Sequence, residues 1–167
     1  MLPDHYIITV DLDSTLADTT HRAPMLLEDG TNDWDAYSQA CSGDAVLAGV
    51  ATLVRILSSL GAEVYALSGR KVSASSHTIE WLQRHEIPIS RVYLDDSDSG
   101  DYDNPFDHVT YKLSKLREIE CSMGADVVLH IDDWPLVHKV FEESGIPTIC
   151  VKAPFEIRKV LDGIPLG

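Results

Sequence analysis

The chain has 167 residues, which is enough for one ordinary domain with a hydrophobic core and too few for two full domains. It carries 13 lysines and arginines against 27 aspartates and glutamates, so its formal net charge is −14. This balance argues against a general nucleic-acid binder, because affinity for the phosphate backbone comes from lysine and arginine. We therefore expect one acidic globular domain over residues 1–167, without an extended basic surface for nucleic acid.

Membrane and disulfide classes are also disfavoured. The longest uncharged apolar-rich run, Ala45 to Val54, is far shorter than a membrane span. The first residues lack the basic and apolar regions of a signal peptide. The three cysteines are far apart and have no zinc-type spacing, which is typical of reduced thiols. We expect a cytoplasmic protein that has no membrane contact.

Apolar runs alternate with segments of helical periodicity along the chain. The segment 45–60 is predicted to be a helix with Asp44 as its N-cap and Gly61 at its end. Strands are predicted at 6–10, 63–67, 92–94, 125–131 and 148–151, and further helices at 75–85, 109–121 and 135–143, with a short one after Pro154. This order predicts an α/β fold with a five-stranded, mostly parallel sheet.

Two segments interrupt the alternation. Residues 18–43 form an insertion after the first strand, with a short helical piece around 33–41. Residues 95–107 form a loop that carries six aspartates and neither lysine nor arginine. Long ordered loops in a compact domain tend to be functional. No reading frame of this loop gives the calcium-binding EF-hand pattern, so we interpret it as a solvated loop near the mouth of a site.

The first predicted strand ends in a pair of carboxylates, Asp11 and Asp13. In an open parallel sheet, ligands bind beyond the carboxyl ends of the strands. Because Leu12 between them points the other way, both carboxylates can face one crevice. The alternative is an Asp-rich turn, in which such side chains cap the local backbone.

Chemistry-bearing residues also follow two other strands. The second strand is followed by Ser68-Gly69-Arg70 and the fourth by Asp132-Asp133, with Lys112 on the helix before the fourth strand. Singly, these are typical of a turn, a helix cap and a surface lysine. Their joint placement at the ends of three strands indicates one site.

In these motifs the sequence resembles the haloacid dehalogenase-like (HAD) phosphohydrolases. Asp11-x-Asp13-x-Thr15 resembles the nucleophile loop, Ser68-Gly69-Arg70 the second motif, Lys112 the third and Asp132-Asp133 the metal motif. The likeness runs over residues 5–152. It implies a Rossmann-like HAD fold with strand order 3-2-1-4-5, in which the insertion at 18–43 is small.

The resemblance also implies a mechanism. Asp11 would attack phosphorus and form an aspartyl-phosphate. Asp13 would act as general acid and base. Mg²⁺ would bind Asp11, the Asp13 carbonyl and the Asp132/Asp133 pair. Ser68, Gly69, Arg70 and Lys112 would bind phosphoryl oxygens, with Lys115 as the other candidate for the lysine.

Within this superfamily the chain is similar to the 3′-phosphatase module of phage-type polynucleotide kinase/phosphatases. The likeness rests on His21-Arg22, the segment 33–37 with Cys41 and Asp44, Trp81-Leu82, Ile87-Pro88 and the segment 100–102. It implies that Arg22 contacts the substrate phosphate. Trp34 and Tyr37 either pack the insertion on the domain, which we favour, or stack on a base.

The chain departs from that pattern where basic residues are usual. Asp95-Asp96 follows the third strand and Trp134 follows the aspartate pair, while Asp107 shifts the expected acidic residue before Lys112 by one position. No phosphate-binding GxxxxGK[ST] loop occurs, so a kinase half is absent. His130 precedes the aspartate pair and is interpreted as a core or surface histidine.

The expected activity is Mg²⁺-dependent hydrolysis of a phosphomonoester. The expected partner is a phosphorylated small molecule or a nucleic-acid end, with a nucleotidic 3′-phosphate preferred. The alternatives are a 5′-nucleotidase or small-molecule phosphatase, and, from another class, a catalytically idle HAD-fold binding or regulatory module. A receiver-like phospho-acceptor, which would keep its aspartyl-phosphate for long periods, is a further possibility.

Overall fold

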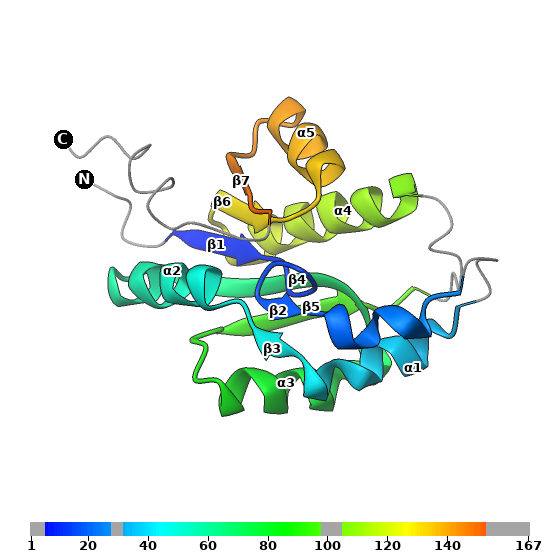
Figure 1. Cartoon of the computed structure of the whole chain (residues 1–167). Coiled ribbons are helices and arrows are strands. Elements are labelled where there is room, and N and C mark those ends of the chain that lie inside the picture. The colour runs from blue at the N-terminus through cyan, green and yellow to red at the C-terminus, as the bar shows by residue number, and fades with distance from the viewer. Residues whose placement is uncertain (1–5, 28–31, 98–104, 153–167) are drawn as a thin grey trace.

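The computed structural model describes residues 6–27, 32–97 and 105–152 (Figure 1). Its main sheet contains β1 (Ile7–Val10), β4 (Glu63–Lys71), β5 (Arg91–Asp95), β6 (Val127–Asp132) and β7 (Thr148–Cys150). The strand order is β5-β4-β1-β6-β7 and every neighbouring pair is parallel. The predicted order 3-2-1-4-5 is confirmed. The helix expected after Pro154 lies outside the described residues.

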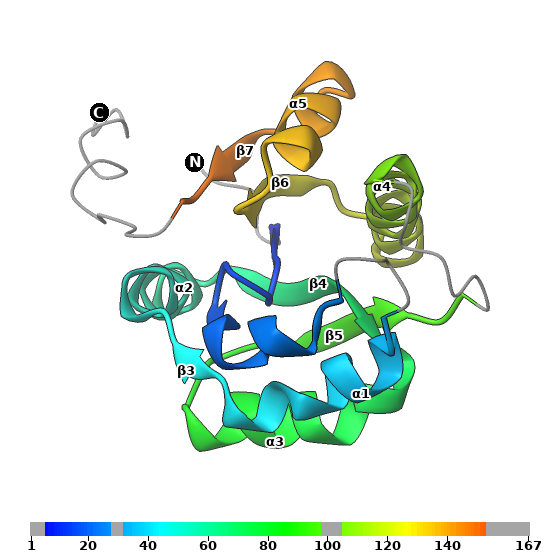
Figure 2. The same cartoon turned by 45° about the vertical axis from the view of Figure 1, so that its right-hand side comes forward.

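Four helices cover the two faces of this sheet: α2 (Ala48–Ser59), α3 (Ser75–Arg84), α4 (Pro105–Met123) and α5 (Pro135–Glu143). Successive strand residues point to opposite faces, so the sheet separates two cores. Ile8 and Val64 pack in the core with α2 and α3, whereas Ile7 and Tyr65 pack in the core with α4 and α5. Figures 1 and 2 show these helix pairs on opposite sides of the sheet. None of the described helices is long and apolar enough to cross a membrane.

The insertion closes on itself through a second, small sheet. β2 (Ala17–Asp18) pairs antiparallel with β3 (Ala45–Val46). Between them lie η1 (Thr20–Met25), α1 (Trp34–Gln39) and η2 (Ala40–Gly43). The Asp33 side chain caps α1 by accepting a 2.9 Å hydrogen bond from the Ala36 amide, which confirms the predicted helical piece. α1 contacts β4 and η3 (Val72–Ala74), close to the carboxyl end of β4 (Figure 2).

The predicted start of the helix at 45–60 is wrong. α2 begins at Ala48 with Leu47 as its N-cap, and no side chain caps it. The preceding residues are taken by β3, and the Leu47 amide donates to the Leu16 carbonyl oxygen at 2.9 Å. Asp44 is therefore not an N-cap, and its carboxylate is buried in an ionic network described below.

The strand predicted at 63–67 continues to Lys71 as β4. The pairing register with β5 shifts between Leu67 and Lys71, so the chain bulges across Ser68-Gly69-Arg70 instead of leaving the sheet. A Cβ atom at Gly69 would lie 1.9 Å from Cε1 of His108, so any other residue there would require the His108 ring to move. α4 begins at Pro105, earlier than the predicted Val109, and this longer helix carries His108 over the bulge.

Candidate active site

A pocket of about 320 Å³ opens where the carboxyl ends of β1, β4 and β6 meet. Its floor is polar and its sides carry aromatic rings. The described residues that line it are Asp11, Asp13, Trp34, Tyr37, Ser38, Ser68, Gly69, Arg70, His108, Lys112, Asp132, Asp133 and Trp134. The structure thus brings together every site residue predicted from the sequence except Arg22, which lies behind the pocket wall.

Three carboxylates form a cluster on the pocket floor. One oxygen each from Asp11, Asp132 and Asp133 lie within 4.8 Å of one another. The Thr15 hydroxyl lies between two of them, 3.4 Å from Oδ2 of Asp11 and 3.3 Å from Oδ1 of Asp133. Oxygen-only donors at this spacing fit Mg²⁺, which prefers a few carboxylates and retained water. The Asp13 carboxylate lies outside this cluster, and its carbonyl remains a predicted ligand.

Lys112 is the buried cation of the floor. Its Nζ lies 2.9 Å from Oδ1 of Asp11 and 2.6 Å from Oδ2 of Asp132. Burial raises the pKa of Asp11 to about 8 although Lys112 opposes the rise. Burial would also raise the pKa of Asp132, but Lys112 holds it below its usual range. The other candidate, Lys115, pairs with Glu118 and does not line the pocket.

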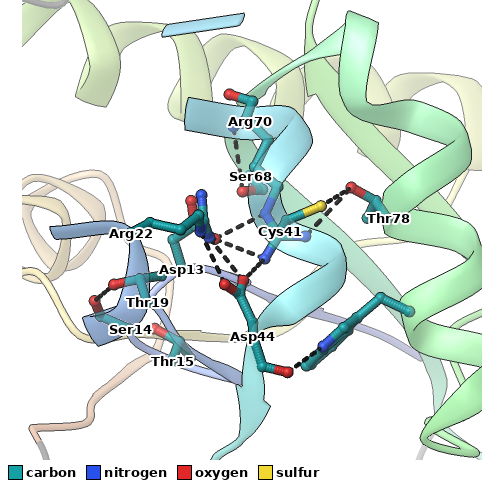
Figure 3. Close-up of polar contacts among 12 residues, drawn as sticks. Asp13, Ser14, Thr15, Thr19, Arg22, Cys41, Asp44, Ser68, Arg70 and Thr78 are labelled. Carbon is teal, nitrogen blue, oxygen red and sulfur yellow. Dashed lines mark hydrogen bonds and ion pairs between the residues drawn. The ribbon is translucent and has the colours of Figure 1, made fainter. Parts of the chain in front are cut away.

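Asp13 is held by two arginines (Figure 3). Nη2 of Arg22 and Nε of Arg70 each donate to its Oδ1 at 2.7 Å. Burial would raise the pKa of Asp13, but the two guanidinium groups outweigh it and lower the pKa below the usual range. The two arginines therefore favour the carboxylate form of Asp13 in this arrangement of the site.

The two arginines share a second acceptor, Asp44, whose side chain is fully buried. Arg22 donates to Asp44 through Nε at 2.8 Å and Nη2 at 2.7 Å, and Arg70 donates through Nη2 at 3.0 Å. Figure 3 shows Asp13 and Asp44 joined through the arginines. We call Asp13, Arg22, Arg70 and Asp44 the arginine clamp. Arg22 was predicted to contact the substrate. Its Nη1 donates to the Tyr37 carbonyl oxygen at 2.9 Å.

The backbone after Asp13 is tightly wound. Ser14 has φ of 62°, in the left-handed region that L-residues seldom adopt. The Leu12 carbonyl oxygen accepts from the amides of Leu16 and Ala17 at 2.9 and 2.8 Å. This turn directly follows Asp13, whose side chain contacts Arg22 and Arg70 and lines the pocket.

Behind the carboxylate cluster lies His130, which is completely buried. Its Nδ1 is 2.8 Å from the Thr9 hydroxyl and its Nε2 is 3.1 Å from Oδ2 of Asp132. Burial lowers the pKa of His130, so the ring is neutral. The proton then belongs on Nε2, because a carboxylate can only accept, and the Thr9 hydroxyl donates to Nδ1. The histidine predicted for the core or surface is a core residue that touches the site.

Aromatic rings form the sides of the pocket. Trp34 and Tyr37 of α1 pack edge to face with centroids 5.8 Å apart, and Tyr37 lies 4.4 Å from the guanidinium of Arg22. α4 contributes His108 and the start of α5 contributes Trp134, and the ring centroids of these two residues are 5.4 Å apart. Tyr37 thus packs against Trp34 and Arg22, which both belong to the insertion, and it lines the pocket.

The acidic replacement after the third strand is neutralised in the fold. Oδ2 of Asp95 accepts from Nζ of Lys71 at 3.0 Å, and both side chains are largely buried. Of the other aspartates of the acidic loop, Asp98, Asp101 and Asp103 lie outside the described residues.

Sequence reasoning missed four residues that shape this site. His108 had a usable signal, because it precedes Lys112 by one helical turn and must share its face of α4. Trp134 was noted only as a missing basic residue. Asp44 was noted only as a helix cap and as part of the motif likeness, and Lys71 had no local signal; the partners of both lie far away in the sequence.

No family model matches the sequence, and no curated protein matches it. Solved structures do. A chain of the Pnkp1/Rnl/Hen1 RNA repair complex is similar with a TM-score of 0.67 and 21% identity over 89% of this chain and 42% of that one. The class C acid phosphatase from Bacillus anthracis gives a TM-score of 0.62 and 22% identity, covering 91% of this chain and 68% of that chain.

A third similar structure is a HAD family enzyme from Bacteroides thetaiotaomicron in complex with magnesium and inorganic phosphate. Its TM-score is 0.58 at 14% identity, with 93% of this chain and 98% of that chain covered. The chain spans less than half the length of the RNA repair chain that it matches. These likenesses establish that the chain has the haloacid dehalogenase-like fold, as its motifs predict.

Proposed function

We propose that this protein is a Mg²⁺-dependent phosphomonoester hydrolase that works through an aspartyl-phosphate on Asp11. The observation that carries the proposal is the joint presence in one pocket of the Asp11/Asp132/Asp133 cluster, Lys112 and Asp13. A turn-capping role for these carboxylates does not explain why a buried lysine bridges Asp11 and Asp132.

We assign the role of nucleophile to Asp11, whose carboxylate form a bound Mg²⁺ would favour against the effect of burial. In the first step a carboxylate oxygen of Asp11 bonds to phosphorus, and the bond between phosphorus and the leaving oxygen breaks. In the second step water attacks the phosphorus and releases inorganic phosphate. A bound Mg²⁺, held by Asp11, Asp132 and Asp133 with the Asp13 carbonyl, would offset the negative charge of the phosphoryl group.

Asp13 serves the proton transfers of both steps. It gives a proton to the leaving oxygen in the first step and takes one from water in the second. The clamp favours its carboxylate form, so its state in the described structure suits the second step, removal of a proton from water. This rapid second step is what separates a phosphatase from a receiver-like phospho-acceptor.

The phosphoryl oxygens would be bound by Ser68, Gly69 and Lys112. Ser68 is buried and lines the pocket beside the bulge of β4. Lys112, which lies 2.9 Å from Asp11, would neutralise charge on the reacting group. Arg22 and Arg70 are proposed as additional phosphate contacts, reached when their hydrogen bonds to Asp13 rearrange.

The preferred substrate class is a nucleotidic 3′-phosphate. Two observations support it: the motif likeness to 3′-phosphatase modules, and the structural likeness to a chain of an RNA repair complex. A 5′-nucleotidase or small-molecule phosphatase is the second candidate, favoured by the likeness to a class C acid phosphatase.

The test is phosphate release in Mg²⁺ from a 3′-phosphorylated oligonucleotide, a 3′-mononucleotide and a 5′-mononucleotide. Each is assayed with the wild-type protein and with Asp11→Asn. We expect turnover on 3′-phosphates that the substitution abolishes. Preference for the 5′-mononucleotide would support the second candidate. No turnover by folded wild-type protein would favour an idle HAD-fold module.

A further inference from the structure

The pocket combines paired cations with unusual aromatic walls, and these two features together restrict what can occupy it. Among the described lining residues, the only lysine and arginine are Lys112 and Arg70. Lys112 pairs with Asp11 and Asp132, and Arg70 pairs with Asp13 and Asp44. Each of these two cations is therefore already paired with two carboxylates, and neither offers an unpaired positive charge to a second phosphate.

The cations behind the pocket are matched in the same way. Arg22 pairs with Asp13 and Asp44, and Lys71 pairs with Asp95. These four cations face six carboxylates, the sixth being Asp133 of the cluster. One divalent cation would offset this excess and leave no net positive charge, so the site holds no unmatched cation for a phosphate beyond the reacting one. Further phosphates of a polynucleotide would approach a chain of net charge −14.

The walls are suited to a flat, apolar group. Trp34 from α1 and Trp134 at the N-terminus of α5 are both half-buried and both line the pocket. Trp134 is anchored against the core under α4 and α5 and contacts His108. Burial lowers the pKa of His108 to about 4, so its ring is neutral near pH 7 and adds no positive charge. A ring placed between these side chains would gain stacking without needing a cation.

The size of the pocket agrees. At about 320 Å³ it lies at the lower end of the roughly 300–1,000 Å³ that small-molecule sites occupy. That volume accommodates a phosphate with one attached ring system.

We propose that the substrate is a small phosphomonoester with one phosphate and a planar aromatic group stacked on Trp34 and Trp134, such as a mononucleotide, and not a polynucleotide end. This inference rests on the proposed phosphohydrolase function and narrows its substrate class.

A matched pair of substrates tests the stacking. Benzyl phosphate and cyclohexylmethyl phosphate have similar size and both release a primary alcohol, but only the first has a planar aromatic ring. We expect kcat/KM to favour benzyl phosphate by roughly tenfold, within the range that base–aromatic stacking supplies. Trp34→Leu and Trp134→Leu should each reduce this ratio, whereas Trp34→Phe and Trp134→Phe should keep most of it. A ratio near one in the wild-type protein would overturn the stacking proposal.

The number of phosphates is tested separately. A 3′-mononucleotide, its 3′,5′-bisphosphate and a 3′-phosphorylated oligonucleotide are compared at low and at higher salt. We expect kcat/KM to fall with each added phosphate. The difference in kcat/KM among the three substrates should be smaller at higher salt, because screening weakens the repulsion between the added phosphates and the acidic protein. Higher kcat/KM on the oligonucleotide would refute the single-phosphate restriction.

A binding measurement keeps the inference separate from the proposed activity. Quenching of tryptophan fluorescence in Asp11→Asn, with Mg²⁺ present, gives affinities for the same benzyl and cyclohexylmethyl phosphates without turnover. If the variant binds the benzyl compound selectively but the wild-type protein hydrolyses neither compound, the hydrolase proposal is wrong and the aromatic site stands. If the wild-type protein hydrolyses both compounds and the variant binds them with equal affinity, the aromatic site is wrong and the hydrolase proposal stands.

Discussion

Asp44 is the residue on which we expect the site to depend most, although no substrate reaches it. Replacing it by asparagine keeps its shape and removes its charge. The asparagine amide then faces Nη2 of Arg22 and Nη2 of Arg70, which donate to Oδ2 at 2.7 and 3.0 Å in the wild-type protein. Donor would meet donor, and two buried guanidinium groups would share Asp13 alone. Asp44→Asn is therefore equivalent to breaking a buried ion pair by removing one partner.

Such a loss destabilises a protein by about 3–5 kcal/mol. For a chain of this length, 1 kcal/mol lowers Tm by about 2–4 °C, so we expect a fall of about 6–20 °C. The assay is thermal unfolding by circular dichroism, with Asp126→Asn, an exposed carboxylate, as the matched control. A double-mutant cycle with Arg22→Gln should show that the two substitutions together cost less than their sum. A Tm within about 2 °C of wild type, or additive effects in the cycle, would refute the clamp.

Three further predictions concern the metal, its support and pH. Mg²⁺ at one hundred times its Kd should add about 2.7 kcal/mol to the free energy of unfolding and so raise Tm. Asp133→Asn should lose most of this rise in Tm in a melting series; an unchanged rise would exclude Asp133 as a ligand. His130→Asn should weaken Mg²⁺ binding by roughly tenfold in calorimetry, because residues that support metal ligands have effects of this size. Thr9→Val should act in the same direction. Full affinity in both variants would contradict the idea that His130 and Thr9 position Asp132. Burial holds the pKa of His108 at about 4 in the folded protein, below its ordinary 6.5, so between these values only the unfolded chain takes up the proton and stability falls as pH falls. The free energy of unfolding, measured with urea, should fall by about 1 kcal/mol less between pH 7 and pH 5.5 in His108→Gln than in the wild-type protein. An unchanged dependence of this free energy on pH would show that His108 titrates normally.

The sequence alone determined the layout of the sheet and the floor of the pocket. Both follow from local patterns, because alternating apolar runs specify strands and helices, and parallel strands bring their carboxyl ends to one edge. Asp11, Asp132 and Ser68 each stand at the end of a predicted strand, so their convergence could be inferred without coordinates. Lys112 followed from the motif order.

Element ends were less predictable where long-range contacts decided them. The helix starting at 48 lost its first turn to the pairing of β3 with β2, a contact between segments far apart in the chain. The extension of β4 through Gly69 depends on the neighbouring strand and on His108 of α4. Helical periodicity and turn propensity describe only the local chain and carry no record of either contact.

The arginine clamp is what only the tertiary structure decided. Asp44 follows a short 3₁₀ segment and by local rules is a helix cap, while Arg22 and Arg70 by themselves indicate a phosphate grip. Folding places the three side chains together with Asp13 in a site from which water is largely excluded, and there their charges satisfy one another. The strength of such a pairing comes from burial and from partners distant in sequence, and neither quantity is present in the local pattern of residues.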